Sequence, residues 1–202
     1  MENLHLIVGL GNPGAEYRQS RHNAGFEVVE RLAERWAVGW TNEKKFNARV
    51  ARSGRGDRIA LLCQPQTYMN SSGEALAAVV SFYHVEVNQL LVVVDDADLP
   101  LGELRLRPGG TSGGHHGLES IEQHLGTRQY ARLRIGIGRQ NAAREITGHV
   151  LSRFDSTERD LVDKVLTLAA DQAECWLMAG IQKAMNQFNG PVNGTETEGK
   201  EQ

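Results

Sequence analysis

Features that would indicate a membrane protein, a disulfide framework or a nucleotide-binding P-loop are missing from this sequence. No apolar run approaches the length of a membrane span, and Met1 to Asn3 does not begin a signal peptide. The two cysteines, Cys63 and Cys175, lie far apart without metal-ligand spacing, so we expect buried, reduced thiols. No GxxxxGK[ST] loop is present. These absences predict a cytoplasmic enzyme or binding protein.

The overall charge gives little indication of a nucleic-acid partner, but its distribution does. The formal net charge of the 202 residues is -3. The segment from Glu103 to Arg144 nevertheless holds seven arginines against three glutamates. This asymmetry predicts a basic face for phosphates, although alternate arginines can also simply cover the solvent side of strands. The seven are Arg105, Arg107, Arg128, Arg132, Arg134, Arg139 and Arg144, and the best candidates are Arg105, Arg107 and Arg134.

Strand and helix patterns alternate along the chain, which predicts one α/β domain with a mixed twisted β-sheet flanked by helices. The continuous apolar run LLVVV at 90–94 is typical of a central strand buried on both faces. Helices are expected near 24–37, 72–84, 118–125 and 156–178, with a shorter one ending near 188. We expect the domain to span residues 1–188 and the polar tail, 189–202, to be disordered.

Polar side chains gather in four loops, several of which follow predicted strands. Ligands of α/β sheets bind at strand ends, so we expect a histidine, an acid and amide side chains to converge there. The four groups are Asn12 with Tyr17 and His22, then Tyr68-Met69-Asn70, then Asp95-Asp96-Ala97-Asp98, and finally the glycine-rich stretch 109–117 with His115 and His116.

The first loop also matches the dinucleotide-binding pattern GxGxxG through Gly9, Gly11 and Gly14. That interpretation requires a helix that opens at the glycines, to hold a pyrophosphate, and an acidic strand end roughly 20 residues on. The helical period begins about ten residues later here, and a helix stands where the second strand is expected. The pattern therefore favours a turn over a nucleotide site.

The other loops have ordinary interpretations as well. The acidic stretch 95–98 could be a solvated turn or a site for a divalent cation. His115 and His116 could ligate a metal, but adjacent side chains usually point apart. Asn70 could be only a helix-start residue. The stretch 109–117 could be a flexible turn or a nest of backbone N–H groups for a phosphate.

Five segments, in order across about residues 4–188, resemble the bacterial peptidyl-tRNA hydrolase family. They are IVGLGNPGAEYRQSRHNAGF, QPQTYMNSSGEAL, LLVVVDDADLPLGELRLRPGG, GGHHGLESI and RLRIGIGR. The resemblance implies a single α/β domain that hydrolyses the ester between a peptide and the 3′ ribose of tRNA. It implies peptidyl-tRNA as the partner, with no cofactor and no metal. We expect a monomer that works in the cytoplasm.

The resemblance also assigns roles by position. His22 is the expected general base that activates water, and Asp95 is expected to orient it. Asn12 helps to distinguish peptidyl from aminoacyl substrates, and Asn70 binds the peptide or the 3′ end near the ester. A carboxylate partner fixes the tautomer of such a histidine, and general base catalysis is typically worth about 10²–10⁴-fold. Tyr17 and Tyr68 are expected to line the substrate cleft.

One position departs from the family pattern. The family usually has GGHNG, whereas this chain has His116 in place of the asparagine. The departure puts a substrate- or water-binding amide in doubt, and it leaves the expected base unaffected. It also keeps open a second interpretation, that of a relative that binds RNA without hydrolysing it, such as an intron-splicing factor.

Overall fold

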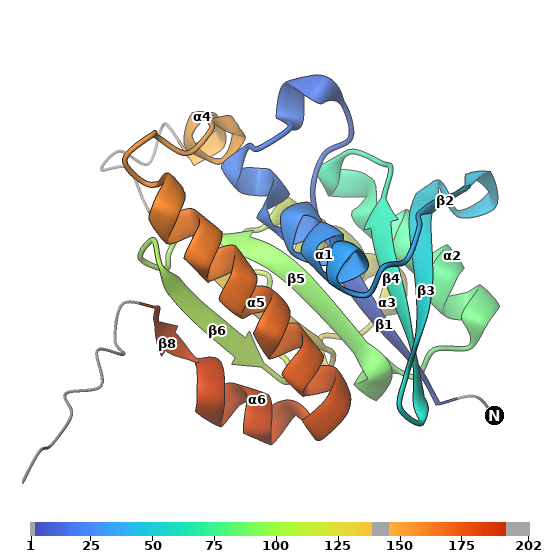
Figure 1. Ribbon diagram of the computed structural model, residues 1–202. Helices are drawn as coiled ribbons and strands as arrows, with labels where there is room; N and C mark the ends of the chain where they lie inside the picture. Colours follow the sequence, from blue (N-terminus) through green and yellow to red (C-terminus); the bar gives the residue numbers. More distant parts are fainter. Residues whose placement is uncertain (1–2, 139–145, 193–202) are drawn as a thin grey trace, which may run out of the picture.

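The computed structural model describes residues 3–138 and 146–192, which form a mixed β-sheet with helices on both faces (Figure 1). The strand order is β2-β3-β4-β1-β5-β7-β6-β8. The strands are β1 (Leu4–Gly9), β2 (Thr41–Glu43), β3 (Ala48–Arg55), β4 (Arg58–Pro65), β5 (Leu90–Asp96), β6 (Glu103–Arg107), β7 (Ala131–Gly136) and β8 (Gly190–Pro191). The helices are α1 (Ala24–Arg35), α2 (Ser72–Tyr83), α3 (His116–Leu125), α4 (Ile146–Leu151), α5 (Arg159–Ala179) and α6 (Ile181–Phe188).

The four central strands, β4, β1, β5 and β7, are parallel, and the outer strands are antiparallel to their neighbours. The predicted single α/β domain with a mixed sheet is therefore confirmed. Because the central strands are parallel, the loops that follow β1, β4 and β5 meet at the same edge of the sheet. This edge is where the polar loops of the sequence come together.

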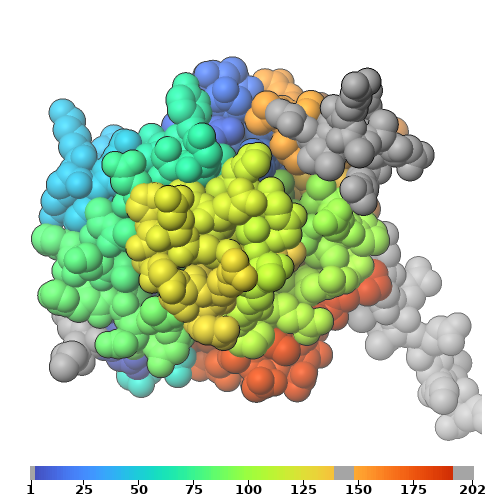
Figure 2. All heavy atoms as spheres, turned by 180° about the vertical axis from the view of Figure 1, so that it is seen from behind, coloured from blue at the N-terminus to red at the C-terminus, as the bar shows by residue number. Residues whose placement is uncertain are grey.

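The core lies in two layers, one on each side of the sheet. Helices α1, α5 and α6 cover one face, and α2 and α3 cover the other. The central strand β5 supplies both layers, with Leu91 and Val93 on one side and Leu90, Val92 and Val94 on the other. The predicted burial of LLVVV on both faces is confirmed. Seen from behind, α3 lies between α2 and the β6 segment (Figure 2).

Two glycines let α1 lie directly against β1. A Cβ on Gly9 would overlap the carbonyl of Gly25, and a Cβ on Gly25 would overlap the backbone of Leu10 and the carbonyl of Val93. The short 3-10 helix η2 (Arg21–Asn23) leads straight into α1. The close contact therefore fixes the position of the segment that carries His22.

The prediction of a disordered tail from Asn189 is wrong for its first residues. Gly190 and Pro191 form β8, which pairs with β6 as the last strand at that side of the sheet. The amide of Asn189 accepts from the N–H of Leu106 at 2.7 Å and donates to its carbonyl at 3.1 Å. One side chain thus satisfies both backbone groups of an edge residue, which composition alone does not reveal. The rest of the predicted tail, 193–202, lies outside the described residues.

The structure also bears on the expectations about membranes and cysteines. Among the described residues, no helix is long and apolar enough to span a bilayer. Cys63 is fully buried, Cys175 is partly buried, and both are free thiols. Burial raises the pKa of the Cys63 thiol to about 12, so it stays protonated and packs as a small apolar side chain.

Candidate active site

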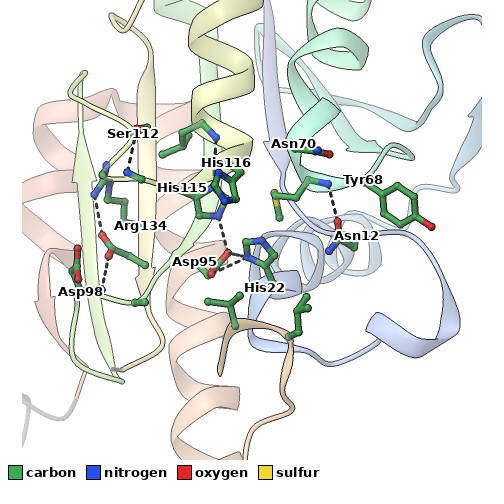
Figure 3. A pocket seen from close by; sticks show the side chains of 18 residues that line it. Asn12, His22, Tyr68, Asn70, Asp95, Asp98, Ser112, His115, His116 and Arg134 are labelled. Carbon is green, nitrogen blue, oxygen red and sulfur yellow. Dashed lines mark hydrogen bonds and ion pairs between the residues drawn. The ribbon is translucent and has the colours of Figure 1, made fainter. Parts of the chain in front are cut away.

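The polar loops converge on one pocket of about 500 Å³ at the carboxyl ends of the parallel strands (Figure 3). The pocket is in the size range of small-molecule and substrate sites. Its polar wall contains Asn12 from the loop after β1, Asn70 from the loop after β4, and Asp95 at the end of β5. His22, His115 and Arg134 also belong to this wall, and Met69, Leu118, Val150 and Leu151 provide apolar surface. The other polar residues that line the pocket are Tyr68, Asp96, Asp98, Ser112 and His116.

His22 and Asp95 form the central contact of the pocket. Nδ1 of His22 lies 2.9 Å from Oδ1 and 3.1 Å from Oδ2 of Asp95, whose side chain is 2% exposed. Burial alone would raise the pKa of Asp95, but attraction and hydrogen bonds from the imidazoles of His22 and His115 outweigh it and hold the pKa well below its usual range. An ionised carboxylate only accepts, so Nδ1 of His22 carries the proton and Nε2 keeps its lone pair.

The two neighbours of His22 anchor η2 to the rest of the protein. The guanidinium of Arg21 donates to Glu158 at 2.7 Å and to the carbonyl of Ile137 at 3.1 Å. The Asn23 side chain accepts from the N–H of Asn12 at 2.9 Å and donates to the carbonyl of Asn12 at 3.0 Å. Both neighbours are buried, so the ring of His22 is presented from a rigid turn.

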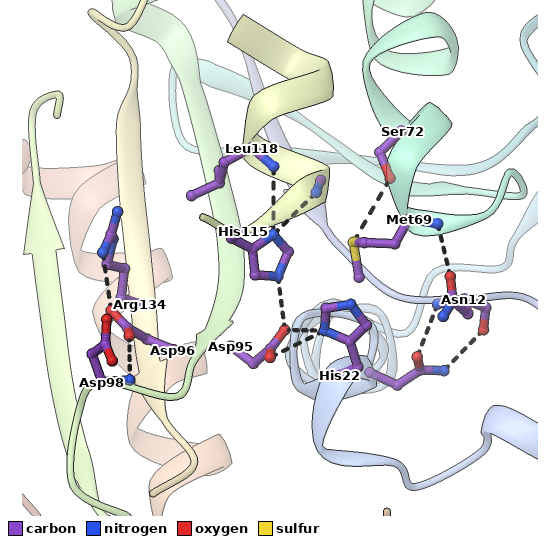
Figure 4. A network of polar contacts seen from close by, with 12 residues as sticks. Asn12, His22, Met69, Ser72, Asp95, Asp96, Asp98, His115, Leu118 and Arg134 are labelled. Atoms are coloured by element: carbon purple, nitrogen blue, oxygen red, sulfur yellow. Dashed lines mark hydrogen bonds and ion pairs between the residues drawn. The ribbon is translucent and has the colours of Figure 1, made fainter. Parts of the chain in front are cut away.

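The Asn12 side chain ties the first loop to the second. Its Oδ1 accepts the backbone N–H of Met69 at 2.7 Å (Figure 4). A backbone N–H can only donate, so this contact settles which end of the amide is oxygen. The amide Nδ2 hydrogen-bonds to no other described residue. Asn12 therefore directs its oxygen at the backbone of Met69 and keeps its NH₂ donors for the pocket, which it lines beside the exposed Asn70.

His115 is a member of the site that the sequence suggested only as a metal ligand. Its Nε2 lies 3.1 Å from Oδ1 of Asp95, the oxygen that also binds His22. Its Nδ1 accepts from the N–H groups of Gly117 and Leu118 at 3.2 and 3.4 Å, which makes His115 the N-cap of α3. The centroids of the two imidazole rings are 4.9 Å apart.

His22, Asp95 and His115 bring three potential metal-ligand atoms within 4.8 Å of one another. A metal on Nε2 of His115 would have to replace the proton there. A neutral ring would then carry its proton on Nδ1, which faces two backbone N–H donors. The geometry therefore favours a proton-sharing group over a metal site.

The carboxylate of Asp96, the last residue of β5, is also occupied. Oδ1 of Asp96 accepts the N–H of Asp98 at 2.8 Å, and Oδ2 binds Arg134 at 3.0 Å. Arg134 further donates to the carbonyl of Thr111. These bonds hold the acidic turn against β7 and against the loop before α3, which is the role of a structural turn.

The glycines of the GxGxxG pattern do not open a helix onto a phosphate. Gly9 ends β1, and Gly14 precedes the single turn η1 (Ala15–Tyr17). The first long helix, α1, begins only at Ala24. The structure thus agrees with the interpretation of this stretch as a turn.

The aromatic residues and His116 lie at the rim. Tyr68 is 63% exposed and lines the pocket. Tyr17 is not among the lining residues, contrary to the sequence prediction; its ring packs edge-on against Tyr68, with centroids 6.5 Å apart. His116 lines the pocket, with its side chain 75% exposed and its Nδ1 3.0 Å from the Glu119 carboxylate.

Four arginines share one face of the sheet beside the pocket. Cross-strand register places Arg105 opposite Arg134 and Arg107 opposite Arg132, so their side chains point to the same side. Arg132 is fully buried and donates to the carbonyl of Thr111 at 2.9 Å, which makes it part of the scaffold. The other three remain candidates for a basic surface.

The three candidates differ in how far nearby acids neutralise them. Arg105 is exposed and pairs with Glu103 at 2.9 Å, and Arg134 pairs with Asp96. Arg107 is exposed and forms no ion pair within the described part of the chain. Of the other arginines in the predicted basic segment, Arg139 and Arg144 lie outside the described residues.

An imidazole backed by a buried carboxylate, at the open end of a parallel sheet, is an arrangement that hydrolytic enzymes use. Residues 6–198 match the family described as Peptidyl-tRNA hydrolase. The chain belongs to the peptidyl-tRNA hydrolase family, and its activity is that of a carboxylic ester hydrolase that acts on peptidyl-tRNA. The resemblance stated from the sequence motifs is thereby confirmed.

Individual relatives agree with this assignment over nearly the whole chain. A peptidyl-tRNA hydrolase of Geobacillus kaustophilus is 45% identical over 186 residues, which cover 92% of this chain and all of the relative. One from Synechococcus sp. (strain JA-2-3B'a(2-13)) is 45% identical over 191 residues, covering 92% and 83% of the two chains. The crystal structure of the Acinetobacter baumannii enzyme superposes with a TM-score of 0.89 at 38% identity, covering 95% of this chain and 98% of that one.

Proposed function

We propose that His22 is the general base of peptidyl-tRNA hydrolysis, with Asp95 as the residue that orients it. The observation that carries the proposal is the 2.9 Å contact between Nδ1 of His22 and the buried carboxylate of Asp95. This contact leaves Nε2, on the other side of a ring that lines the pocket, free to take a proton from water. The hydroxide equivalent then attacks the ester carbonyl, and the 3′ hydroxyl of tRNA leaves.

Asn12 and Asn70 would bind the substrate around the reacting ester. The Oδ1 of Asn12 accepts from the N–H of Met69, which leaves the NH₂ group as the part of the side chain without a protein partner among the described residues. A donor suits the carbonyl oxygen of an acylated amino group and does not suit the ammonium of an aminoacyl-tRNA. This supports the expected role of Asn12 in distinguishing blocked from free substrates. Amide donors of this kind also stabilise developing negative charge on the carbonyl.

The rim of the pocket would bind the rest of the substrate. The exposed ring of Tyr68, supported by Tyr17, offers a surface for stacking at the 3′ end or the peptide. Arg105, Arg107 and Arg134 would bind tRNA phosphates. Like charges directly opposite each other on neighbouring strands cost stability, which supports a functional reason for the arginines. We propose that the protein acts as a monomer in the cytoplasm.

Turnover of an N-acetylated aminoacyl-tRNA by purified His22→Ala tests the proposal. We expect a loss of about 10²–10⁴-fold, the usual worth of a general base. His124→Ala is a matched control, because this histidine lies in the last turn of α3, with Nδ1 2.8 Å from the carbonyl of Ser120, and does not line the pocket. Activity of His22→Ala close to that of the control would refute the assignment. RNA binding without turnover by the unaltered protein would favour a binding relative instead.

A further inference from the structure

The protonation of the His115 ring is fixed by its role as a helix cap. Its Nδ1 accepts the backbone N–H groups of Gly117 and Leu118, at 3.2 and 3.4 Å (Figure 4). Two donors leave no room for a proton on Nδ1, so the neutral ring carries its proton on Nε2. That proton points at Oδ1 of Asp95, 3.1 Å away.

Packing around the cap holds the ring in this orientation. A Cβ on Gly117 would lie 2.5 Å from the sulfur of Met69 and 3.1 Å from Cε1 of His115, so a side chain there would displace the groups packed around the cap. The imidazole of His115 is 12% exposed. The second donor to Asp95 is therefore attached to the start of a helix and not to a mobile side chain.

We propose that His115 is a positioning residue that acts through Asp95 on His22. Its Nε2–H holds the carboxylate in the orientation that faces His22 and takes up part of its negative charge. This inference rests on the proposed role of His22 as the base. His115 itself does not touch the reacting atoms, because both of its nitrogens are occupied by protein partners.

The Nε2–H of His115 should determine how strongly His22 holds the proton that it has taken from water. Without His115, the full charge of Asp95 would act on His22 alone and stabilise its imidazolium form. The acid limb of the kcat/KM profile should then move to higher pH by about one unit, the worth of a hydrogen bond to a charged group.

The other charged groups near the pair are few and are held in place. His22 reaches Asp95 from η2 and His115 reaches it from the start of α3. Further along the described pocket wall lie the Asp96–Arg134 ion pair, Asp98, and His116 with Glu119. The first of these is tied to the acidic turn and the last to the surface of α3, and neither variant described below alters them.

Two substitutions at His115 separate its role as the N-cap of α3 from its role as a hydrogen-bond donor to Asp95. In His115→Asn, the amide oxygen stands near the position of Nδ1, and asparagine is a strong N-cap, but no group reaches Asp95. In His115→Gln, the longer amide can donate to Asp95, but glutamine caps poorly. We expect His115→Asn to keep nearly the wild-type Tm, to lose about tenfold in kcat, and to show the shifted acid limb. We expect His115→Gln to lower the Tm and to restore the wild-type pH profile.

A second measurement does not depend on activity. Long-range ¹H–¹⁵N correlation spectra of the histidine rings report which nitrogen is protonated, and we expect Nε2 for His115 and Nδ1 for His22. A proton on Nδ1 of His115, or an unchanged pH profile in His115→Asn, would overturn the inference. If His22→Ala is inactive while His115→Asn behaves like wild type, only this inference fails. If His22→Ala stays active, the proposed function fails first.

Discussion

Replacement of Asp95 by asparagine tests the proton arrangement at its centre. Both partners of the carboxylate are N–H donors: Oδ1 receives Nδ1 of His22 and Nε2 of His115, and Oδ2 lies 3.1 Å from Nδ1 of His22. Asparagine keeps one acceptor and turns the other oxygen into an NH₂ group. If the asparagine oxygen takes the place of Oδ1, which both histidines contact, the NH₂ group takes the place of Oδ2. It then faces the N–H of His22, and two donors meet.

His22 relieves this conflict when its proton moves from Nδ1 to Nε2, because Nδ1 then accepts from the NH₂ group. The ring then lacks the lone pair that faces the pocket, and it cannot act as a base. We expect kcat/KM to fall by about 10³–10⁴-fold, since a general base contributes up to about 10⁴ and the same change in a serine protease triad costs about 10⁴ in kcat. The assay is single-turnover release of N-acetylated amino acid from tRNA across a range of pH.

Asp96→Asn is the matched control. The Asp96 carboxylate binds Arg134 and the N–H of Asp98, with no contact to either histidine, so we expect a loss of less than about tenfold there. Activity of Asp95→Asn within about tenfold of wild type, or a larger loss in Asp96→Asn, would refute the proton arrangement described for Asp95.

Replacement of Asp95 should also change how the stability of the protein depends on pH. The folded-state pKa of Asp95 lies below its unfolded value of about 3.9, so its stabilisation is fully present above that pH. It is lost as the pH falls below about 4 toward the folded-state pKa. Thermal unfolding of Asp95→Asn should therefore depend less on pH below about 4 than that of wild type. If the Tm of Asp95→Asn falls as steeply with pH as that of wild type, other carboxylates govern the loss of stability in acid.

Three further predictions concern the arginines, His116 and metals. Arg107→Ala should reduce the slope of log affinity for tRNA against log salt by about 0.7–0.9. Arg105→Ala should reduce it less, because Glu103 already pairs with that side chain. Hydrolysis of a short 3′-end mimic should change in neither variant, and equal losses on both substrates would place the arginines at the ester. His116→Asn should stay active, with an advantage over wild type that grows below neutral pH, because a protonated histidine can only donate; a ratio of kcat/KM values that is flat with pH would contradict this. Exhaustive chelation should leave hydrolysis of the short mimic unchanged, whereas a loss restored by a divalent ion would indicate a metal at Asp95.

The sequence predicts the sheet well because its signal is local. The run LLVVV needs only its own composition to indicate a strand buried on both faces, and β5 is that strand. The polar loops were expected at strand ends for the same reason, and the parallel order of β4, β1 and β5 brings them together. The pairing of His22 with Asp95, by contrast, was predicted from the resemblance to a family and not from the pattern of the residues.

The role of His115 was missed for a reason that lies in the helix boundary. The expected helix begins at Leu118, the first buried apolar residue, whereas α3 begins at His116. The first turn of a helix often carries no apolar signal, so the sequence pattern did not reveal which residue is the cap. A start two residues earlier turns His115 into the cap and determines which nitrogen faces Asp95.

The anchors of η2 could not be predicted from local patterns at all. Arg21 is separated by 137 residues from Glu158, and no periodicity links an arginine in one loop to an acid so far away. The same holds for Asn12 and Met69, which are 57 residues apart. Pairings of this kind are decided by topology, which a pattern of residue types does not contain.

The anchoring of Arg21 has a consequence for the order in which the enzyme becomes active during its own synthesis. The backbone N–H of Arg21 binds the carbonyl of Ser152, and its guanidinium binds Glu158 at the start of α5. A ribosome that has translated as far as β7 has already made His22 and Asp95, yet Arg21, in the turn that carries His22, still lacks Ser152 and Glu158 as partners. The anchoring of this turn is completed only when the segment around Glu158 has emerged and folded back. An enzyme that cleaves the link between peptide and tRNA is thus assembled late, after most of its own chain has been translated.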